Sequence, residues 1–237
     1  MIIFGRFLTG VRFFDEKGGL KFGEIYEFVG GPGSYKTALC HQIAVKFVQS
    51  TQRKVIYIDT DGTFQPERLL RISKAFSMNK KLLDNIFVSR HYEFSEIINE
   101  LKIIPEKMDK PFLLIIDSII TPFASIPRDK RIESLFLLAK HLRHIAYLGN
   151  AIIITNQIRA YRQSEFISEL EKQIRIPTTI WEKLGVLPAL HPLIDTFIDT
   201  RIFLQKTSRK MIIGRIIFSR SLKEEIFGIR VVGDILI

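Results

Sequence analysis

One short glycine-rich segment carries the residues best suited to phosphate chemistry. It reads Gly30-Gly31-Pro32-Gly33-Ser34-Tyr35-Lys36-Thr37. The segment directly follows an apolar, β-rich run and directly precedes a helical pattern, which is the context that a phosphate-binding P-loop requires. Glycines let backbone N–H groups crowd around phosphates, and a helix N-terminus adds a favourable dipole. We therefore expect this segment to bind a nucleotide, with Lys36 on its β- and γ-phosphates and the Thr37 hydroxyl on Mg²⁺.

Tyr35 departs from this pattern, because the P-loop has glycine immediately before the lysine. If the backbone needs a positive φ at this position, a bulky residue costs about 1–2 kcal/mol. The side chain can also crowd the site. The alternative interpretation of the segment is a glycine-rich strand-to-helix turn that holds a Lys-Thr pair by coincidence.

Asp117 is the second residue placed for this chemistry. It ends the apolar run 112–116 and is followed by Ser118. A P-loop protein needs an acidic residue at the end of a neighbouring strand to hold the metal, and Asp117 lies where such a residue belongs. An aspartate at a strand end is also a common turn former. Asp117 indicates a metal site only because a P-loop occurs in the same sequence.

The elements that would position these residues alternate between strand and helix patterns, which predicts an α/β fold with a mostly parallel central sheet flanked by helices. Continuous apolar runs such as 113–116 and 152–154 are typical of strands covered on both faces. The predicted strands are 24–29, 55–59, 85–89, 112–117 and 151–155. The predicted helices are 37–49, 66–77, 94–107 and 132–148.

After Asn156 the pattern changes. Residues 159–187 are polar and mixed, and their spacing of apolar residues predicts an amphipathic helix over 163–174. Three β-rich runs follow, at 197–205, 211–218 and 226–232, and a basic connection separates the first two. They predict a C-terminal antiparallel extension of the sheet. Because the chain shows no repeat or convincing linker, we expect one domain over residues 1–237.

Composition limits the class of protein. Apolar residues make up 46% of the chain and charged residues 25%, which excludes a disordered protein. Charges interrupt every stretch that approaches the ~20 residues of a membrane helix, and no secretory leader is evident. The only cysteine, Cys40, can form no internal disulfide and reads as a small buried hydrophobe. We expect an intracellular, cytoplasmic protein.

The net charge of +10 points to a polyanion, either nucleic acid or an acidic membrane surface. Part of the excess lies in 201–230, which holds the eight basic residues Arg201, Lys206, Arg209, Lys210, Arg215, Arg220, Lys223 and Arg230. A solvated basic face without any partner explains the charge equally well.

With both elements of the phosphate site placed, the chain resembles the RecA/RadA recombinase family, specifically the archaeal RadA group and its eukaryotic counterparts. Four blocks carry the resemblance: the P-loop with its lead-in, Gly18-Gly19-Leu20 and Gly23-Glu24-Ile25; Ile58-Asp59-Thr60-Asp61-Gly62-Thr63-Phe64-Gln65-Pro66-Glu67-Arg68; Leu114-Ile115-Ile116-Asp117-Ser118; and Ile153-Ile154-Thr155-Asn156-Gln157. A further segment, Pro188-Ala189-Leu190 followed by Thr200-Arg201-Ile202, resembles archaeal RadA paralogues of the RadB/RadC type more than strand-exchange enzymes.

The resemblance implies a RecA-like ATPase core and roles for single residues. Asp61 stands where the family has a glutamate that polarises the attacking water, and it is one methylene shorter. Gln157 corresponds to the sensor of the γ-phosphate. Arg68 corresponds to the residue whose guanidinium packs on adenine; the alternative is an exposed helix charge. Since Tyr35 and Asp61 both fall in the catalytic apparatus, the sequence leaves open a weak DNA-dependent ATPase or none.

Two loops of this family bind DNA, and the resemblance places them after Asp117 and after Gln157. Their basic residues here are Arg128, Lys130, Arg131, Arg159, Arg162, Lys172, Arg175 and Lys183. Phosphate contacts from such side chains give salt-dependent, sequence-independent affinity. Tyr161, Phe166 and Trp181 could stack on bases or simply pack the segment.

The family's N-terminal helical domain and its Phe-x-x-Ala polymerisation motif have no counterpart ahead of the core, so we expect no extended filament. Phe136-Leu137-Leu138-Ala139 has the letters of that motif but lies in a predicted helix and reads as core. The sequence thus predicts a nucleoid-associated RadA paralogue that binds ATP, Mg²⁺ and single-stranded DNA and modulates a RadA-type recombinase in recombination and repair. The alternative is a non-catalytic adaptor that binds a recombinase or DNA without turnover.

Overall fold

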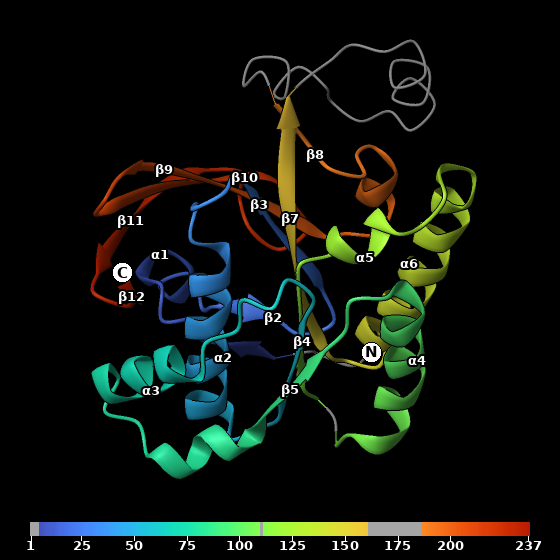
Figure 1. Cartoon of the computed structure of the whole chain (residues 1–237). Coiled ribbons are helices and arrows are strands. Elements are labelled where there is room, and N and C mark those ends of the chain that lie inside the picture. The colour runs from blue at the N-terminus through green and yellow to red at the C-terminus, as the bar shows by residue number, and fades with distance from the viewer. Residues whose placement is uncertain (1–4, 110, 161–185) are drawn as a thin grey trace.

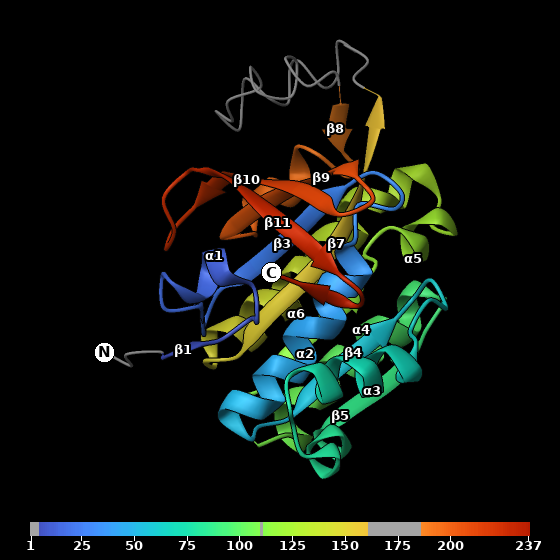
Figure 2. The same cartoon turned by 90° about the vertical axis from the view of Figure 1, so that its left-hand side faces the viewer.

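A large sheet with helices on both faces organises the chain (Figures 1 and 2). The computed structural model describes residues 5–109, 111–160 and 186–237. Within these residues the sheet runs in the order β12-β11-β10-β9-β3-β7-β6-β4-β5, and β8 pairs with the end of β7. Its strands are β3 (Ile25–Gly30), β4 (Val55–Asp59), β5 (Ile86–Arg90), β6 (Leu113–Asp117), β7 (Ala151–Ala160), β8 (Val186–Pro188), β9 (Thr200–Ser208), β10 (Met211–Ser219), β11 (Ile226–Val232) and β12 (Ile235–Leu236).

The half of the sheet from β9 through β3, β7, β6 and β4 to β5 is parallel throughout. The mixed α/β fold with a mostly parallel sheet is therefore confirmed. On one face lie α1 (Arg12–Asp15), α2 (Lys36–Thr51) and α3 (Pro66–Ala75), together with the short ribbon of β1 (Arg6–Phe7) and β2 (Leu20–Lys21). On the other lie α4 (Phe94–Lys107), α5 (Thr121–Ala124) and α6 (Arg131–Tyr147).

The continuous apolar runs of the central strands follow from this double cover. In β6, Leu113 and Ile115 belong to the hydrophobic cluster under α2, whereas Leu114 and Ile116 belong to the cluster under α4 and α6. Alternate side chains of an extended strand point to opposite faces, so a strand buried on both faces needs apolar residues at every position.

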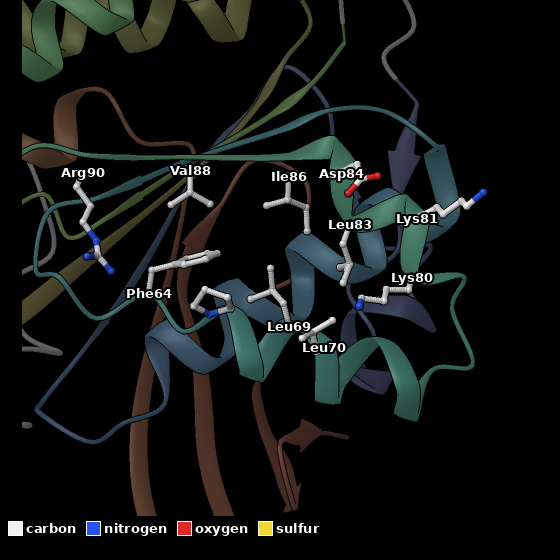
Figure 3. Close-up of a pocket in the computed structure, with 11 residues that line it drawn as sticks. Phe64, Leu69, Leu70, Lys80, Lys81, Leu83, Asp84, Ile86, Val88 and Arg90 are labelled. Carbon is white, nitrogen blue, oxygen red and sulfur yellow. The ribbon is translucent and has the colours of Figure 1, made fainter.

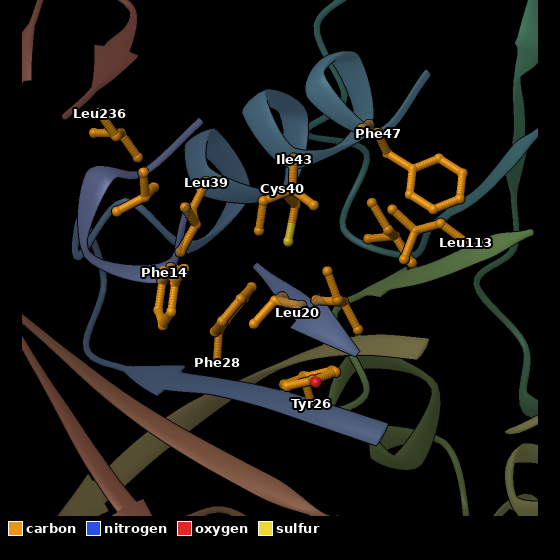
Figure 4. Packing of buried hydrophobic residues seen from close by; sticks show 14 of the residues in the cluster. Phe14, Leu20, Tyr26, Phe28, Leu39, Cys40, Ile43, Phe47, Leu113 and Leu236 are labelled. Carbon is orange, nitrogen blue, oxygen red and sulfur yellow. The ribbon is translucent and has the colours of Figure 1, made fainter. Parts of the chain in front are cut away.

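Helix α2 is the most deeply buried helix of the α1–α3 face. Leu39, Cys40 and Ile43 pack towards Tyr26 and Phe28 of the sheet (Figure 4). On its outer side the Gln42 amide donates to the Leu236 carbonyl at 2.7 Å and its oxygen accepts the Leu236 N–H at 2.7 Å. With its flanks held by the sheet and by β12, α2 fixes the direction of its own N-terminus, where the P-loop residues lie.

Beyond β9 the sheet turns antiparallel: β10 pairs with β9 and with β11, and β11 pairs with β12. The C-terminal antiparallel extension is confirmed. The apolar pattern predicts the last long strand at 226–232, where the structure has it. The predicted start of β9 is three residues early, because residues 197–199, which follow the 3-10 helix η3 (Leu193–Thr196), form a turn and a bend before the strand begins.

Two local expectations differ from the structure. β7 continues to Ala160 instead of ending at Thr155, because its end pairs with β8, which lies far along the chain. The expectation that Phe136 is core is wrong, since its side chain is 55% exposed. Leu135, Leu138 and Leu142 of α6 point to the core at the helical period, which turns Phe136 outward. In the part of the chain that the structure describes, no helix combines the length and apolarity needed to cross a membrane.

Candidate functional site

The candidate site lies where the parallel strands β3, β4, β6 and β7 reach their carboxyl ends, which is where open α/β sheets bind ligands. The register places Gly30 opposite Gln157 and Asp59 opposite Asp117. Residues separated by more than one hundred positions in the sequence thus meet at one edge of the sheet. Lys36 and Thr37 enter from the first turn of α2.

The Lys36 ammonium lies inside the glycine-rich loop. It donates to the carbonyls of Gly30 at 2.8 Å and Gly31 at 3.0 Å, and to the Ser34 hydroxyl at 3.3 Å. Burial lowers the pKa of Lys36, and the carboxylates of Asp117 and Asp61 nearby oppose that shift. No described carboxylate forms an ion pair with it. A half-buried cation with only neutral partners is suited to meet an anionic ligand.

Asp117 is held by hydroxyl groups in a buried position. It is 2% exposed, accepts from Thr155 Oγ1 at 2.5 Å and accepts from the Tyr57 hydroxyl at 2.7 Å. Burial raises the pKa of Asp117, while hydrogen bonds from Thr155, Tyr57 and the Thr37 hydroxyl lower it. The Thr37 hydroxyl, the other expected metal ligand, therefore lies near enough to Asp117 to lower its pKa.

The donor set fits magnesium on a nucleotide better than a metal cage made of protein alone. Among the described residues no three His, Cys, Asp or Glu side chains cluster as a metal site. Mg²⁺ prefers oxygen ligands and, at phosphate sites, takes only one or two from the protein. The hydroxyl of Thr37 and the carboxylate of Asp117 are such a pair, beside a glycine-rich loop that contains a lysine.

Asp61 is oriented by three hydroxyl groups. Its Oδ1 accepts from the Thr121 hydroxyl, from Ser118 Oγ at 3.2 Å and from Thr60 Oγ1 at 3.4 Å. These partners place the carboxylate at the end of β6 beside Asp117. Sequence reasoning missed them, although the hydroxyl-rich residues around Asp117 were visible in the sequence.

Tyr35 adopts the conformation that the P-loop pattern assigns to glycine. Its φ is 69° and its ψ 19°, in the left-handed region. For a residue with a side chain this conformation costs about 1–2 kcal/mol. Contacts of the tyrosine ring and hydroxyl with Lys206 and Arg209 offset this cost. The Tyr35 hydroxyl donates to the Arg209 carbonyl at 3.3 Å, and Lys206 Nζ lies 5.7 Å from the ring centroid. A hydrogen bond and an exposed cation–π contact contribute about 0.5–1.5 and 0.5–1 kcal/mol respectively.

Gly30 is required for a different reason. A Cβ at this position would lie 2.3 Å from the Leu204 carbonyl oxygen. β9 therefore passes directly against the start of the loop, and only glycine allows that approach.

Sequence comparison agrees with this geometry. The chain matches the family model described as Rad51 over residues 4–179. The chain belongs to the Rad51 family. The fold is accordingly a RecA-like core, and membership places the chain among RecA-like proteins of DNA recombination and repair.

Gln157 and Arg68, whose roles the resemblance to RecA/RadA recombinases implied, lie at the borders of the site. Gln157 is exposed, and its carbonyl accepts from the Ala189 N–H at 2.8 Å, where β7 leaves the main sheet. Arg68 does not turn its guanidinium freely to solvent: it pairs with Asp234 at 3.2 Å, as Arg71 does at 2.5 Å. Its proposed role on adenine stays a prediction.

The residues expected to bind DNA divide into three groups. Arg128, Lys130 and Arg159 are exposed near the same end of the sheet. Arg131 is half-buried and donates to the Ile126 carbonyl at 3.0 Å, so it also holds the turn η2 (Arg128–Lys130). Arg162, Lys172, Arg175 and Lys183 lie outside the described residues, as do Tyr161, Phe166, Trp181 and the helix expected over 163–174.

Arg201, counted above with the basic residues of 201–230, is no surface charge. It is 0% exposed, with Nε paired to Glu27 and Nη2 to Asp195 at 2.6 Å. Asp195 also bonds His191 Nδ1 at 2.9 Å, and Asn156 Nδ2 donates to Glu27 at 2.6 Å. This cluster joins β3, β7, β9 and η3 inside the fold, which no count of charges along the sequence could show.

An apolar groove of about 670 Å³ lies beside β5, the edge of the sheet opposite to β12 (Figure 3). Leu69 and Leu70 of α3, Leu83 of η1 (Lys80–Asn85) and Ile86 and Val88 of β5 line it. The exposed cations Lys80 and Lys81 stand at its rim. Among the described strands β5 is the last of the sheet, so its outer edge carries no strand partner.

Proposed function

We propose that the protein is an archaeal RadA paralogue of the RadB/RadC type that binds ATP·Mg²⁺ and single-stranded DNA and modulates a RadA-type recombinase in the cytoplasm, at the nucleoid. The observation that carries the proposal is the Lys36 ammonium, which lies in the glycine-rich loop beside Thr37 and Asp117 and whose hydrogen-bond partners among the described residues are all neutral.

Each residue of the site has a role in this proposal. Lys36 and the amides of residues 30–37 hold the phosphates, and Thr37 and Asp117 hold the metal, which when bound neutralises charge on the phosphates. Asp61 orients a water molecule, and Gln157 reads whether the γ-phosphate is present. Because Gln157 begins the strand segment that leads to Arg159, nucleotide binding would change the DNA affinity of residues 159–187.

Calorimetric titration with ATP and Mg²⁺ tests nucleotide binding. We expect binding by the wild type, none by Lys36→Ala, and unchanged binding by the control Lys46→Ala, which removes a lysine of the same helix that contacts Gln49. A wild type that gives neither heat nor thermal stabilisation contradicts the proposal.

Turnover is a separate question. Asp61 is shorter than the glutamate it replaces and is already held by hydroxyl groups, which favours weak hydrolysis stimulated by single-stranded DNA. An ATPase assay with and without DNA on the wild type and on Tyr35→Gly measures this. Nucleotide binding without any turnover in either protein supports the adaptor instead.

DNA binding rests on the exposed cations Arg128, Lys130 and Arg159. Neutralising phosphate contacts makes affinity fall with salt, by a slope of about −0.7 per contact on single strands. Replacing the three residues by glutamine should reduce both affinity and slope. Equal binding at 50 and 300 mM salt would exclude these contacts.

The apolar groove beside β5 favours a second function, that of the non-catalytic adaptor. Its apolar floor, free strand edge and lysine rim fit an extended, acidic segment of a recombinase with an apolar side chain at its centre. Val88→Asp should abolish binding of a RadA-type recombinase and leave ATP binding intact. Retained recombinase binding by this variant excludes the groove.

A further inference from the structure

The turn between β9 and β10 lies against the phosphate loop. β9 pairs with β3 up to Phe203 opposite Val29 and then runs on past Gly30. Residues 205–210 are exposed, and Arg209 in the turn accepts the Tyr35 hydroxyl through its carbonyl at 3.3 Å. The two segments are thus joined at the tip of the turn as well as along the strands.

Three cations, Lys206, Arg209 and Lys210, occupy this connection, here named the basic turn. None of them forms an ion pair with a carboxylate in the described part of the chain. Lys206 is the one that the loop orients: its Nζ lies 5.7 Å from the centroid of the Tyr35 ring. A cation over an aromatic face keeps its charge and can still donate hydrogen bonds to an anion.

Tyr35 has a backbone conformation that favours glycine. Glycine would adopt its φ of 69° without strain, so the tyrosine has a cost at this position that the loop alone does not repay. Its hydrogen bond to Arg209 and its cation–π contact with Lys206 both go to the basic turn, while its ring also packs against the hydrophobic cluster under α2. The residue that departs from the P-loop pattern is therefore also the residue that fixes where the basic turn stands.

We propose that Tyr35 is a positioning residue that holds the basic turn against the phosphate loop, and that Lys206 acts there as a second cation for the bound triphosphate. This role rests on the nucleotide binding proposed above. In this proposal Tyr35, which replaces the usual glycine, contributes to nucleotide binding instead of impairing it. Nucleotide binding would then also affect the C-terminal antiparallel strands.

Calorimetry with ATP and with ADP on single and double variants tests the assignment. Lys206→Gln should weaken ATP binding about tenfold and ADP binding less, since the added cation serves the longer phosphate chain. Lys206→Arg should restore most of the affinity. Arg209→Gln is the matched control: it removes one charge from the same turn but keeps the carbonyl that Tyr35 bonds, and should bind within twofold of the wild type.

The coupling between the two residues is the decisive readout. Tyr35→Gly should weaken ATP binding as Lys206→Gln does, and the double variant should be no weaker than either, because Tyr35 acts through Lys206. Tyr35→Phe keeps the ring and should lose less. In the wild type, ATP should slow amide exchange over residues 206–210, and in Tyr35→Gly it should not.

Three outcomes overturn the assignment. Equal losses in Lys206→Gln and Arg209→Gln show a general effect of charge, and additive losses in the double variant show that Tyr35 does not act through Lys206. Unchanged ATP binding by Lys206→Gln, with a wild type that binds, removes the role of Lys206 and leaves the proposed function standing. A wild type that binds no ATP removes both.

Discussion

Two groups of charges lie on the same sheet and are built in opposite ways. In the cluster of Glu27, Arg201 and Asp195 each charge has an oppositely charged partner, and all three side chains are buried. In the phosphate site Lys36, Asp61 and Asp117 stand near one another, yet each is bonded to carbonyls or hydroxyls instead of to a charge.

The pKa shifts reflect this difference. Burial alone lowers the pKa of Arg201, but Glu27 and Asp195 outweigh it and raise that pKa. The pKa of Asp195 is lowered by Arg201 and His191 against the effect of burial, whereas burial still raises the pKa of Glu27. For Lys36 and Asp117 the effect of burial outweighs that of the neighbouring groups. The pKa of Lys36 is therefore lowered and that of Asp117 raised, and both shifts favour the neutral form of the side chain. The two cations therefore differ: the carboxylates around Arg201 favour its charged form, whereas burial disfavours the charged form of Lys36, which has no ion pair among the described residues.

The largest effect is expected from breaking the paired cluster. Arg201→Met leaves Glu27 and Asp195 buried without their cation and should lower the free energy of unfolding by about 3–5 kcal/mol. Arg220→Gln is the control, since this arginine pairs with Asp199 but its side chain is 69% exposed, and it should cost less than about 1 kcal/mol. Urea unfolding of both variants measures the difference; equal costs would show that the cluster is not a special source of stability.

Acid should lower the free energy of unfolding by protonating His41, which lies in α2, the helix that follows the glycine-rich loop. This ring is buried against Tyr57 and Phe64 and has no hydrogen-bond partner among the described residues, and burial lowers its pKa to about 4. Because the folded pKa lies below the unfolded value of 6.5, stability is lost as the pH falls from 6.5 towards 4. The loss amounts to about 2–3 kcal/mol over this window. His41→Leu should remove it in urea titrations between pH 4 and 7, and an unchanged pH profile would contradict the buried neutral ring.

A smaller effect of opposite sign is expected from Asp117→Asn. The raised pKa of Asp117 means that the folded state holds its proton more tightly, so stability falls as the pH rises from the ordinary value of 3.8 through the folded pKa. Removing the buried charge should raise the free energy of unfolding by about 1 kcal/mol at pH 7 while it abolishes Mg²⁺-dependent nucleotide binding. A destabilised Asp117→Asn would mean that its hydroxyl partners outweigh the cost of burial.

The smallest effect separates strain from contact at Tyr35. Tyr35→Ala keeps a side chain at a positive φ and loses the contacts with Arg209 and Lys206, whereas Tyr35→Gly loses the contacts and relieves the strain. The glycine variant should therefore be more stable than the alanine variant by about 1 kcal/mol. Chemical denaturation that ranks alanine above glycine would show that the loop does not need this conformation in solution.

Much of this molecule could be predicted from its sequence because the signals are local. Strand β4 over 55–59 and helix α4 over 94–107 lie where the apolar periodicity puts them, and Gly30–Thr37 declares a strand-loop-helix turn through its own residue types. The end of β7, by contrast, depends on β8, and the exposure of Phe136 depends on which face of α6 meets the sheet.

The sequence by itself predicted the alternation of the long strands and helices, the glycine-rich loop with its Tyr35, and the resemblance to the recombinase family, since each depends on residue types at short spacing. Only the tertiary structure decided that Arg201 is buried among carboxylates, that Asp61 is held by hydroxyls, and that Tyr35 bonds the turn at Arg209. The contacts of Arg201 with Glu27, of Asp61 with Ser118 and of Tyr35 with Arg209 join residues 57 to 174 positions apart. Local residue patterns leave open which distant segments meet, because that depends on the order and register of the strands.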